Sequence, residues 1–411
     1  MKPGRVVIAG GGAAGIFAAI ACAEAAPDLE VWVFEKGPEL LAKVRISGGG
    51  RCNVTHSCFE PREFARRFPR GERALIGAFQ RFQAADTVEW FESRGVKLKT
   101  ERDGRMFPVT DSSQTIMNCL LGRARAAGVK FTLNCGVESA ARGTEGGFLL
   151  QLTNGDPFEC NRLLLATGGC RGPALGRLAT SLGHQLESPV PSLFTFQIEI
   201  PWLRELAGVS VATMEASVPS AGLRERGPLL VTHWGLSGPV ILRISAWGAR
   251  ELHARNYRFP LRVNWLPSLG ESAIAASLQS CRAAQPARLV VNSPLAPLPA
   301  RLWEKLVLAA GIPGSKRWAD ISKADQHRLI LYLRQTELPV TGKSLNKDEF
   351  VTCGGVRLGE VEFKTMQSRV CPGLFFAGEL LDIDGITGGF NFQAAWTTGW
   401  IAGHALAEID G

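Results

Sequence analysis

The sequence lacks the residue patterns of a metal centre or a disulfide framework. It has ten cysteines, but no two of them are three positions apart, which excludes a CxxC metal or redox pair. The six histidines are widely scattered, so they predict no zinc site. A chain of 411 residues is long enough to form its core without disulfides. We therefore expect reduced cysteines, no bound metal and a cytoplasmic location.

Long hydrophobic runs are also missing. The most apolar stretch, residues 6–23, contains four glycines, three of them consecutive. It is shorter than the roughly 20 unbroken apolar residues of a membrane span. Its glycines suit a turn better than the hydrophobic helix of a secretion signal. We expect no membrane partner.

Dense runs of one charge sign are absent. Lys and Arg number 46 and Asp and Glu 38, a net charge of +8 that is scattered through the chain. Without a basic cluster, this excess favours a solvated surface with some attraction for anionic cofactors. Nucleic acid is therefore an unlikely partner by this reading. We find no internal repeat and no low-complexity tail.

The N-terminal segment has the pattern of a dinucleotide-binding strand, turn and helix. Residues 5–9 are apolar and β-branched, and Gly10, Gly12 and Gly15 follow in GxGxxG spacing. Gly10 permits a tight turn, Gly12 lets a pyrophosphate approach the backbone, and Gly15 lets the helix pack on the strand. The helix N-terminus offers amides and the positive end of its dipole to phosphates.

An acid follows the second predicted strand, residues 31–34. Glu35 lies 20 residues after Gly15, where a carboxylate binds the ribose hydroxyls of a dinucleotide. An acid at this place favours unphosphorylated ribose, and therefore FAD or NAD over NADP. The alternative is a glycine-rich turn in another α/β fold.

Two distant stretches favour FAD. "RLLLATGG" (162–169) reads as a buried strand with a glycine end, and residues 372–403 read as a strand, a glycine-acid step, a glycine-rich loop and a final helix. They resemble the second and third FAD motifs of glutathione-reductase-like flavoproteins. That resemblance implies that the glycine-acid step binds the ribityl chain and that the last helix points its amides at the pyrimidine end of the flavin.

The acid of this step departs from the usual pattern, in which Asp follows the glycine. Here the residue is Glu379, with Asp382 and Asp384 close behind, so the acid that meets the ribityl hydroxyls stays open. A second GxGxxG, typical of enzymes with a separate NAD(P)H domain, is not evident.

Four stretches together carry a more specific resemblance. They are "ISGGGRCNVTH" (46–56), "THWGLSGPVILRIS" (232–245), "VTCGGV" (351–356) and "GLFFAGELLDIDGITGGFNFQAAWTTG" (373–399). Over nearly the whole chain they resemble the BaiN/YhiN-like family of FAD-dependent (NAD(P)/FAD) oxidoreductases. The resemblance implies that the SGGGRCN loop lies against FAD.

The three consecutive glycines of this loop clear side chains away from its backbone. Consecutive amides can form an anion nest, and Lys43 and Arg51 can add charge. The alternative is that Gly48, Gly49 and Gly50 only form a difficult turn. Cys52 has no partner cysteine nearby, so we interpret it as a small apolar filler and not as a redox thiol.

These motifs give a set of predicted site residues. The predicted cofactor-binding residues are Gly10, Gly12, Ala13, Ala14, Gly15, Glu35, Lys36, Lys43, Gly49, Gly50, Arg51, Cys52, Asn53, Val137, Ala166, Thr167, Gly168, Gly378, Glu379, Asp384, Gly389, Phe390, Asn391, Phe392 and Gln393. Arg51, Asn53 and His233 are also candidates for catalysis, although His233 fits a structural turn equally well.

We predict an α/β fold with an interrupted cofactor domain. The glutathione-reductase-like FAD-binding Rossmann domain comprises residues 1–190 and 345–411. A small β-barrel, residues 191–265 and 335–344, is inserted, and it carries a helical subdomain, residues 266–334. Short strands are expected at 194–200, 229–232 and 261–265. Ser322 is expected to cap a helix.

The predicted function is an FAD-dependent oxidoreductase, since FAD carries the redox step and the protein binds and orients it. The resemblance favours a reductase that passes hydride through flavin N5 to an activated C=C of a small molecule, with NAD(P)H as a candidate electron donor. The alternatives are a flavin-dependent oxidase or monooxygenase, and a nucleic-acid-linked flavoprotein. The substrate and the oligomeric state stay open.

Overall fold

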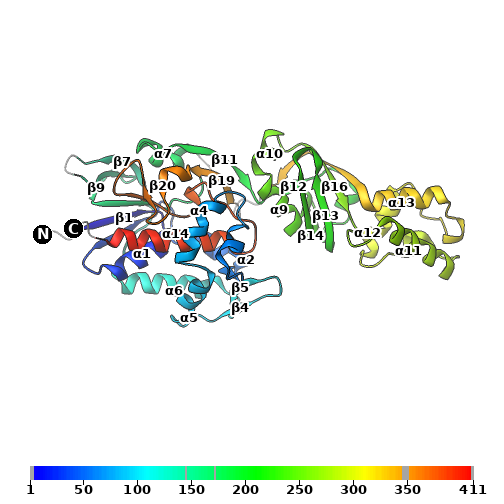
Figure 1. Cartoon of the computed structure of the whole chain (residues 1–411), viewed down its shortest axis with the longest axis horizontal. Helices are drawn as coiled ribbons and strands as arrows, with labels where there is room; N and C mark the ends of the chain where they lie inside the picture. The colour runs from blue at the N-terminus through cyan, green and yellow to red at the C-terminus, as the bar shows by residue number, and fades with distance from the viewer. Residues whose placement is uncertain (1–3, 144–145, 171–172, 345–350, 409–411) are drawn as a thin grey trace. The chain divides into compact units, whose positions relative to one another are not determined.

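The computed structural model describes residues 4–143, 146–170, 173–344 and 351–408 (Figure 1). The chain forms two compact units, Met1–Pro191 with Lys347–Gly411, and Ser192–Asn346. The cofactor motifs at both ends of the chain therefore share one unit. Residue 345, the expected start of the second cofactor segment, lies outside the described residues.

A mixed sheet forms the centre of the first unit. Its strand order is β20-β21-β22-β10-β1-β2-β6, and the five strands from β22 to β6 are parallel. The strands are β1 (Arg5–Ala9), β2 (Glu30–Phe34), β6 (Lys130–Thr132), β10 (Arg162–Leu165), β20 (Val361–Glu362), β21 (Gln367–Ser368) and β22 (Leu374–Phe376). Central β1 is buried from Val6 to Ala9, as its apolar run predicts. The carboxyl ends of β1, β10 and β22 therefore meet at one edge.

Different elements cover the two faces of this sheet. On one face, α1 (Ala13–Ala25) packs so closely that a Cβ added to Gly15 would lie 3.3 Å from the Ile8 side chain. On the other face, Trp32 and Phe34 of β2 contact Phe158, with ring centroids 5.2 and 5.0 Å apart. Phe158 belongs to a three-stranded antiparallel sheet formed by β7 (Val137–Arg142), β8 (Phe148–Leu152) and β9 (Pro157–Cys160).

Two helices from opposite ends of the chain lie side by side over the sheet (Figure 1). The last helix, α14 (Phe390–Ala407), packs on α1 through small residues. A Cβ added to Gly399 or Gly403 would lie 2.5 Å from the carbonyl oxygen of Ala14 or Ala18. The backbones approach this closely only because these positions are glycine.

The remaining elements of the first unit are short. They are α2 (Ala42–Gly50), β3 (Thr55–His56), α3 (Pro61–Ala65), α4 (Glu72–Arg81), α5 (Ala84–Glu92), β4 (Leu98–Thr100), β5 (Arg105–Pro108), α6 (Ser113–Ala126), α7 (Pro173–Ser181), β11 (Leu186–Ser192), β19 (Val351–Val356), η4 (Leu358–Glu360) and η5 (Gly378–Leu380). Within the described residues, none of the helices is both long and apolar enough to cross a bilayer.

The second unit contains a closed sheet. Its strand order is β17-β16-β13-β14-β15-β12-β18, and only Thr341 separates β17 from β18 in sequence. Because one continuous extended segment forms both ends of this order, the sheet closes into the expected barrel. The strands are β12 (Thr195–Gln197), β13 (Ser210–Val218), β14 (Leu223–Thr232), β15 (Gly235–Ser237), β16 (Phe259–Asn264), β17 (Thr336–Val340) and β18 (Gly342–Ser344).

The helices of the second unit follow the barrel strands or lie between them. They are α8 (Pro201–Arg204), η1 (Pro219–Ala221), α9 (Pro239–Trp247), α10 (Ala249–Ala254), α11 (Glu271–Ala284), η2 (Val290–Asn292), α12 (Ala300–Ala309), η3 (Trp318–Asp320) and α13 (Lys323–Gln335). Ser322 caps α13, because its hydroxyl accepts a hydrogen bond of 3.0 Å from the Asp325 amide. This confirms the predicted cap. A separate helical subdomain stays a prediction, since α11, α12 and α13 fall in the same compact unit as the barrel.

Candidate functional site

The first glycine-rich turn has the expected geometry. Gly10 has a φ of +112°, and a Cβ added there would lie 2.4 Å from the Ala166 carbonyl oxygen. A Cβ on Gly15 would lie 2.0 Å from the Gly10 carbonyl oxygen. Beside Gly12, by contrast, an added Cβ would meet no atom within 4 Å. The turn is therefore crowded where helix and strands meet and open where a ligand would approach.

The start of α1 is free to accept an anion. Its N-cap, Gly12, provides no side-chain hydrogen bond, and the first turn, with Ala13 and Ala14, has no acidic residue. Helix amides at this position need an acceptor from elsewhere. A phosphate group is a suitable acceptor, because it also interacts favourably with the helix dipole.

Glu35 is fixed at the end of β2. One carboxylate oxygen accepts a hydrogen bond of 2.7 Å from the Gly11 amide, and the other accepts one of 2.7 Å from the Gly37 amide. Two other residues of the predicted set, Lys36 and Val137, lie nearby. Lys36 is exposed, and its side chain lies against Gly136, the residue before Val137. These residues form the end of the site where a ribose is expected.

The end of β10 adds a second open segment. Ala166 continues the sheet by donating its amide to the Ala9 carbonyl at 2.9 Å. The buried Thr167 hydroxyl has no hydrogen-bond partner among the described residues. Gly168 has a φ of +78° with no atom within 4 Å of an added Cβ. An unpaired buried hydroxyl is costly, so Thr167 requires a partner from a ligand or water.

The glycines of the SGGGRCN loop are bare and exposed. Gly49 and Gly50 have φ values of +69° and +83°, and a Cβ on either would meet no atom within 4 Å. Gly48 is different, because its added Cβ would lie 3.0 Å from Phe107. Gly48 is therefore needed for local packing, whereas the other two leave a backbone surface that a flat molecule could contact.

A carboxylate joins this region to the C-terminal motif. Glu379 in η5 accepts a hydrogen bond of 2.5 Å from Lys43 at the start of α2 and one of 2.7 Å from the Thr352 amide of β19. Its neighbour Gly378 donates its amide to the Thr398 hydroxyl at 2.9 Å. Three segments far apart in sequence are thus connected around one acid.

The other predicted acid, Asp384, has a different environment. Its side chain is fully buried and forms an ion pair with Arg70, whose Nε lies 2.6 Å from the carboxylate. Among the acids considered for the ribityl chain, Glu379 is the one that lies beside the motif glycines. Cofactor contact by either acid stays a prediction.

The start of α14 leaves only its backbone for a ligand. The first-turn side chains bind the protein: Phe390 stacks on His56 with centroids 4.8 Å apart, and Asn391 donates to the Gly385 carbonyl at 2.9 Å. Phe392 stacks on Trp396 at 5.6 Å. Gln393 accepts a hydrogen bond of 2.6 Å from Thr55. Gly389, at φ +93°, provides no side-chain cap, and the first turn has no acid.

Two catalytic candidates hold the SGGGRCN loop in place. The Asn53 amide, oriented to satisfy its neighbours, donates to the Thr55 carbonyl at 3.0 Å and accepts from the Gly389 amide at 2.9 Å. Arg51 lies 4.0 Å above the Phe107 ring and 2.6 Å from Glu101, whose hydrogen bond raises the pKa of the guanidinium. Both side chains therefore have structural partners, and their catalytic roles stay predictions.

The third candidate and Cys52 have simpler surroundings. His233 is exposed in the second unit, in the turn between β14 and β15. Cys52 is fully buried, and burial raises the pKa of its thiol to about 12. The thiol is therefore protonated at neutral pH, which agrees with a packing role. None of the ten cysteines forms a disulfide, and no cluster among the described residues could hold a metal ion.

Sequence reasoning missed three residues at this site. Thr352 and Thr398 hold Glu379 and Gly378 through hydrogen bonds. The His56 ring lies on Phe390, and its buried Nδ1 has no partner among the described residues. Thr352, Thr398 and His56 all lie inside stretches that carried the family resemblance, so position in a motif was the available signal.

These features fit FAD. The open backbone at Gly12, Gly49, Gly50 and Gly168 suits a long flat ligand, and the free helix starts suit its phosphates and its electron-rich end. The unpaired Thr167 hydroxyl offers a further polar contact.

Comparison with known proteins agrees with this site. Residues 4–405 match the family described as HI0933-like protein Rossmann domain. The chain is 31% identical to a 3-dehydro-bile acid delta(4,6)-reductase of Clostridium scindens, over 98% of this chain and 99% of that protein. It is 32% identical to a ribosomal RNA dihydrouridine synthase of Escherichia coli, over 97% of each chain.

Solved structures share the fold. A 3-ketosteroid Δ1-dehydrogenase from Sterolibacterium denitrificans has a TM-score of 0.51 at 14% identity, covering 99% of this chain and 100% of that one. A 3-ketosteroid-Δ4-(5α)-dehydrogenase from Rhodococcus jostii has a TM-score of 0.50 at 14% identity, covering 100% and 98%. At this identity the likeness shows the fold alone. The family match confirms the resemblance inferred from the four sequence stretches: the chain belongs to the HI0933-like family and is an FAD-dependent oxidoreductase.

Proposed function

We propose that this protein reduces a carbon–carbon double bond that is conjugated to a carbonyl group. One observation carries the proposal: two relatives that match nearly the whole chain are both named for saturating such a bond, although their substrates differ completely. One name specifies a delta(4,6)-reductase of a 3-oxo steroid acid, and the other specifies the formation of dihydrouridine from uridine. The reaction that both names share is therefore a better basis for a proposal about this chain than either substrate.

In this proposal, different residues of the site bind different parts of the cofactor. The α1 amides after Gly12 bind the pyrophosphate, and Glu35 binds the ribose hydroxyls, with Lys36 and Val137 beside it. Gly49, Gly50 and Thr167 line the middle, and Glu379 meets the ribityl chain. Bound FAD supplies hydride transfer through its N5 atom, with NAD(P)H as the proposed electron donor.

The chain itself supplies electrostatic stabilisation. The uncapped start of α14 presents the positive end of an 18-residue helix, which stabilises negative charge placed beside it. Asn53 binds the Gly389 amide and so holds the SGGGRCN loop against this helix start. Trp396 adds a second link, because its Nε1 donates to the Val54 carbonyl at 2.9 Å. The loop and the helix start are therefore positioned as one piece.

An anaerobic titration tests the reaction class. The purified yellow protein is titrated with NADH and with NADPH, and the flavin absorbance should bleach with at least one of them. A steroid 4-en-3-one or a uridine-containing RNA is then added without oxygen, and one of them should restore the absorbance. Failure of both nucleotides to bleach the flavin contradicts the nicotinamide-linked proposal. Reoxidation by oxygen that is fast, with none by either acceptor, favours an oxidase or monooxygenase.

A second observation favours RNA as the substrate-bearing molecule. Residues 192–346 contain 18 Lys and Arg against 10 Asp and Glu, a net charge of +8, whereas the rest of the chain has 28 of each and is neutral. The whole excess therefore belongs to the inserted unit. Concentrated positive charge attracts a polyanion. This candidate replaces our expectation, drawn from the sequence as a whole, that nucleic acid is not a partner.

The two substrate classes are separated by one comparison. Ribosomal RNA from a strain that lacks the gene is incubated with the reduced enzyme, and dihydrouridine is measured by mass spectrometry. Formation of dihydrouridine supports the RNA candidate. Turnover of the steroid enone with no change in the RNA supports a small-molecule reductase.

A further inference from the structure

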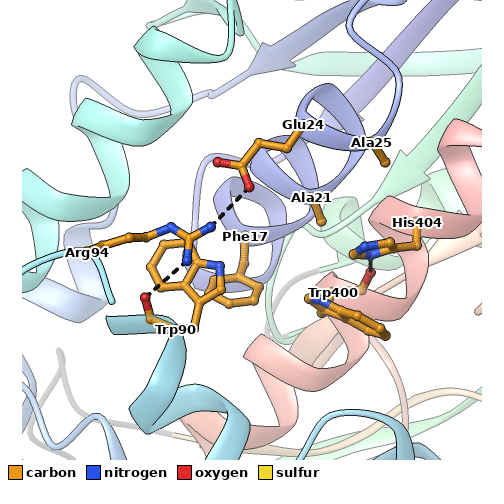
Figure 2. A pocket seen from close by; sticks show the side chains of 8 residues that line it. All are labelled: Phe17, Ala21, Glu24, Ala25, Trp90, Arg94, Trp400 and His404. Atoms are coloured by element: carbon orange, nitrogen blue, oxygen red, sulfur yellow. Dashed lines mark hydrogen bonds and ion pairs between the residues drawn. The ribbon is translucent and has the colours of Figure 1, made fainter. Parts of the chain in front are cut away.

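A cavity of about 300 Å³ is lined by none of the predicted cofactor residues. Figure 2 shows the side chains that line it. Its lining residues come from α1, from the C-terminal half of α14, and from the end of α5 and the turn after it. It is lined by Phe17, Ala21, Glu24, Ala25, Trp90, Arg94, Trp400 and His404. The cofactor motifs lie at the N-termini of α1 and α14, so this cavity is a separate feature at the other end of the same helices. Its volume falls at the lower end of the range of small-molecule sites.

The rings that line the cavity are held by their neighbours. Phe17 is buried and contacts Trp90, with ring centroids 4.7 Å apart. Trp400 stacks on Phe82 at 5.2 Å and lies 4.0 Å from the ring of His404. Fixed aromatic walls favour a flat aromatic guest, which can stack on them or meet their edges.

The lining of the cavity includes one carboxylate, Glu24, and one guanidinium group, Arg94. The Arg94 guanidinium lies 4.2 Å above the Trp90 ring and donates to Glu24 at 3.1 Å. A dashed line marks the bond to Glu24 in Figure 2. Arg123 also donates to the Glu24 carboxylate, at 3.1 Å from its Nε. One carboxylate is thus shared by two guanidinium groups. Because Arg94 has to share Glu24 with Arg123, a ligand with one anionic group is favoured, since charge-assisted hydrogen bonds to Arg are strong.

We propose that this cavity binds a small aromatic monocarboxylate, with its ring against Phe17, Trp90 and Trp400 and its carboxylate toward Arg94. The proposal does not depend on the reaction proposed above. The Nδ1 of His404 donates to the Trp400 carbonyl at 2.9 Å. This hydrogen bond fixes the imidazole ring of His404 at the rim of the cavity, which supports the assignment.

Calorimetric titration of the FAD-loaded full chain tests the proposal with three probes of similar shape. Indole-3-acetate is the anion, indole is neutral and tryptamine is the cation. We expect indole-3-acetate to bind about tenfold more tightly than indole, and tryptamine to bind most weakly. Ala25→Trp fills the cavity and should weaken indole-3-acetate at least tenfold.

A matched variant controls for surface changes. Ala126→Trp should leave binding unchanged, because Ala126 is also the exposed last residue of a helix, α6, but does not line the cavity. Arg94→Gln should lower the affinity for indole-3-acetate to that for indole, and it should change the affinity for indole by less than twofold. This variant decides the matter if Ala25→Trp does not fold. Absence of binding by all three probes, tryptamine binding as tightly as indole-3-acetate, or full affinity in Ala25→Trp each overturns the proposal.

Discussion

At the scale of single residues, the exposed glycines of the SGGGRCN loop are the clearest link between sequence and cofactor. Gly49 needs a left-handed backbone, and no atom of the protein lies where its side chain would be. The protein therefore gains no packing from a glycine here. Close approach of the cofactor to this backbone stays our prediction for Gly49.

We predict that Gly49→Val greatly lowers the FAD content while the chain stays folded. The valine side chain would occupy the space that the cofactor needs. Flavin per mole of protein, measured by absorbance, and circular dichroism check the two parts. Gly128→Val is the matched control, because Gly128 has a φ of +79° and an equally open surrounding. It has the same backbone strain of about 1–2 kcal/mol, and its FAD content should be normal. Equal FAD content in both variants contradicts the close-approach argument.

The buried ion pair of Asp384 gives a second prediction. Asp384→Asn removes the carboxylate that pairs with the Arg70 guanidinium, whose side chain is only 11% exposed. We expect a loss of about 3–5 kcal/mol in the free energy of unfolding. Denaturant unfolding of the purified variant measures it. Glu63→Gln removes an exposed partner of Arg66 and should cost less than about 1 kcal/mol. A small effect at Asp384 would show that the pair does not stabilise the loop before α14.

At the scale of helices and strands, the close contact of α1 and α14 determines the stability of the site. A Cβ at Gly403 would lie 2.5 Å from the Ala18 carbonyl oxygen and 2.6 Å from the Ala21 Cβ. We expect Gly403→Ala to lower the melting temperature and the FAD content together, at a cost of about 1–3 kcal/mol. Differential scanning calorimetry measures the shift.

Gly122→Ala is the comparison for this prediction. Gly122 lies within α6, and an added Cβ would meet no atom within 4 Å. Alanine should therefore stabilise that helix by up to about 1 kcal/mol. Equal behaviour of the two variants would contradict the role of Gly403 in helix packing.

A buried histidine predicts how stability depends on pH. His184 follows α7 and hydrogen-bonds Glu360 at 2.9 Å and Ser368 at 2.7 Å. Burial lowers its pKa, although Glu360 opposes this effect. The unfolded chain, with a histidine pKa near 6.5, therefore binds this proton more readily than the folded protein. The contribution of His184 to the free energy of unfolding therefore falls as the pH drops below about 6.5, by at most about 1.4 kcal/mol per pH unit.

Unfolding midpoints of the wild type and of His184→Gln between pH 5 and pH 8 check this sign. The variant should depend less on pH, whereas His253→Gln, which changes an exposed histidine, should follow the wild type. A steeper acid dependence in His184→Gln would contradict the assignment.

The sequence predicted those elements whose pattern is local. β1 has the predicted bounds, Arg5–Ala9, because a short apolar run before GxGxxG allows few alternatives. β13 and α9 were missed. β13 becomes a strand by pairing with β14 and β16, and α9 packs against β13 and β14. Such tertiary partners cannot be read from single segments.

The residues of the candidate site also fall into two groups, those predictable from local sequence and those brought together only by the fold. Most of the glycines were predictable, since a positive φ or a close neighbour requires glycine at Gly10, Gly15, Gly49 and Gly168, whereas Gly12 has neither. Glu379 is bound by Lys43 and by the Thr352 amide. Lys43 is 336 residues from Glu379 in the sequence, so only the fold brings these groups together. Asn53 and Arg51 were considered for catalysis because polar residues in a motif suggest chemistry, whereas their observed contacts are with the protein.

At the scale of the whole molecule, the uneven charge gives the prediction for RNA. Two triple variants have the same net charge: Arg224, Arg258 and Arg288 changed to Gln in the inserted unit, and Arg62, Arg66 and Arg125 changed to Gln in the neutral unit. All six arginines are exposed. Only the first set should weaken binding to ribosomal RNA and flatten its salt dependence, by a slope of up to about 2. Filter binding at several salt concentrations measures both. Equal loss in the two sets would assign the binding to net charge.

The cofactor unit is built from both ends of the chain, and this has a consequence for biosynthesis. β22 and α14, which complete its sheet and cover α1, are translated after the insert. While the ribosome is still making the insert, the nascent chain exposes the apolar flank of α1 and has no complete place for a flavin. The complete cofactor site therefore forms only after α14 has been synthesised and has packed on α1.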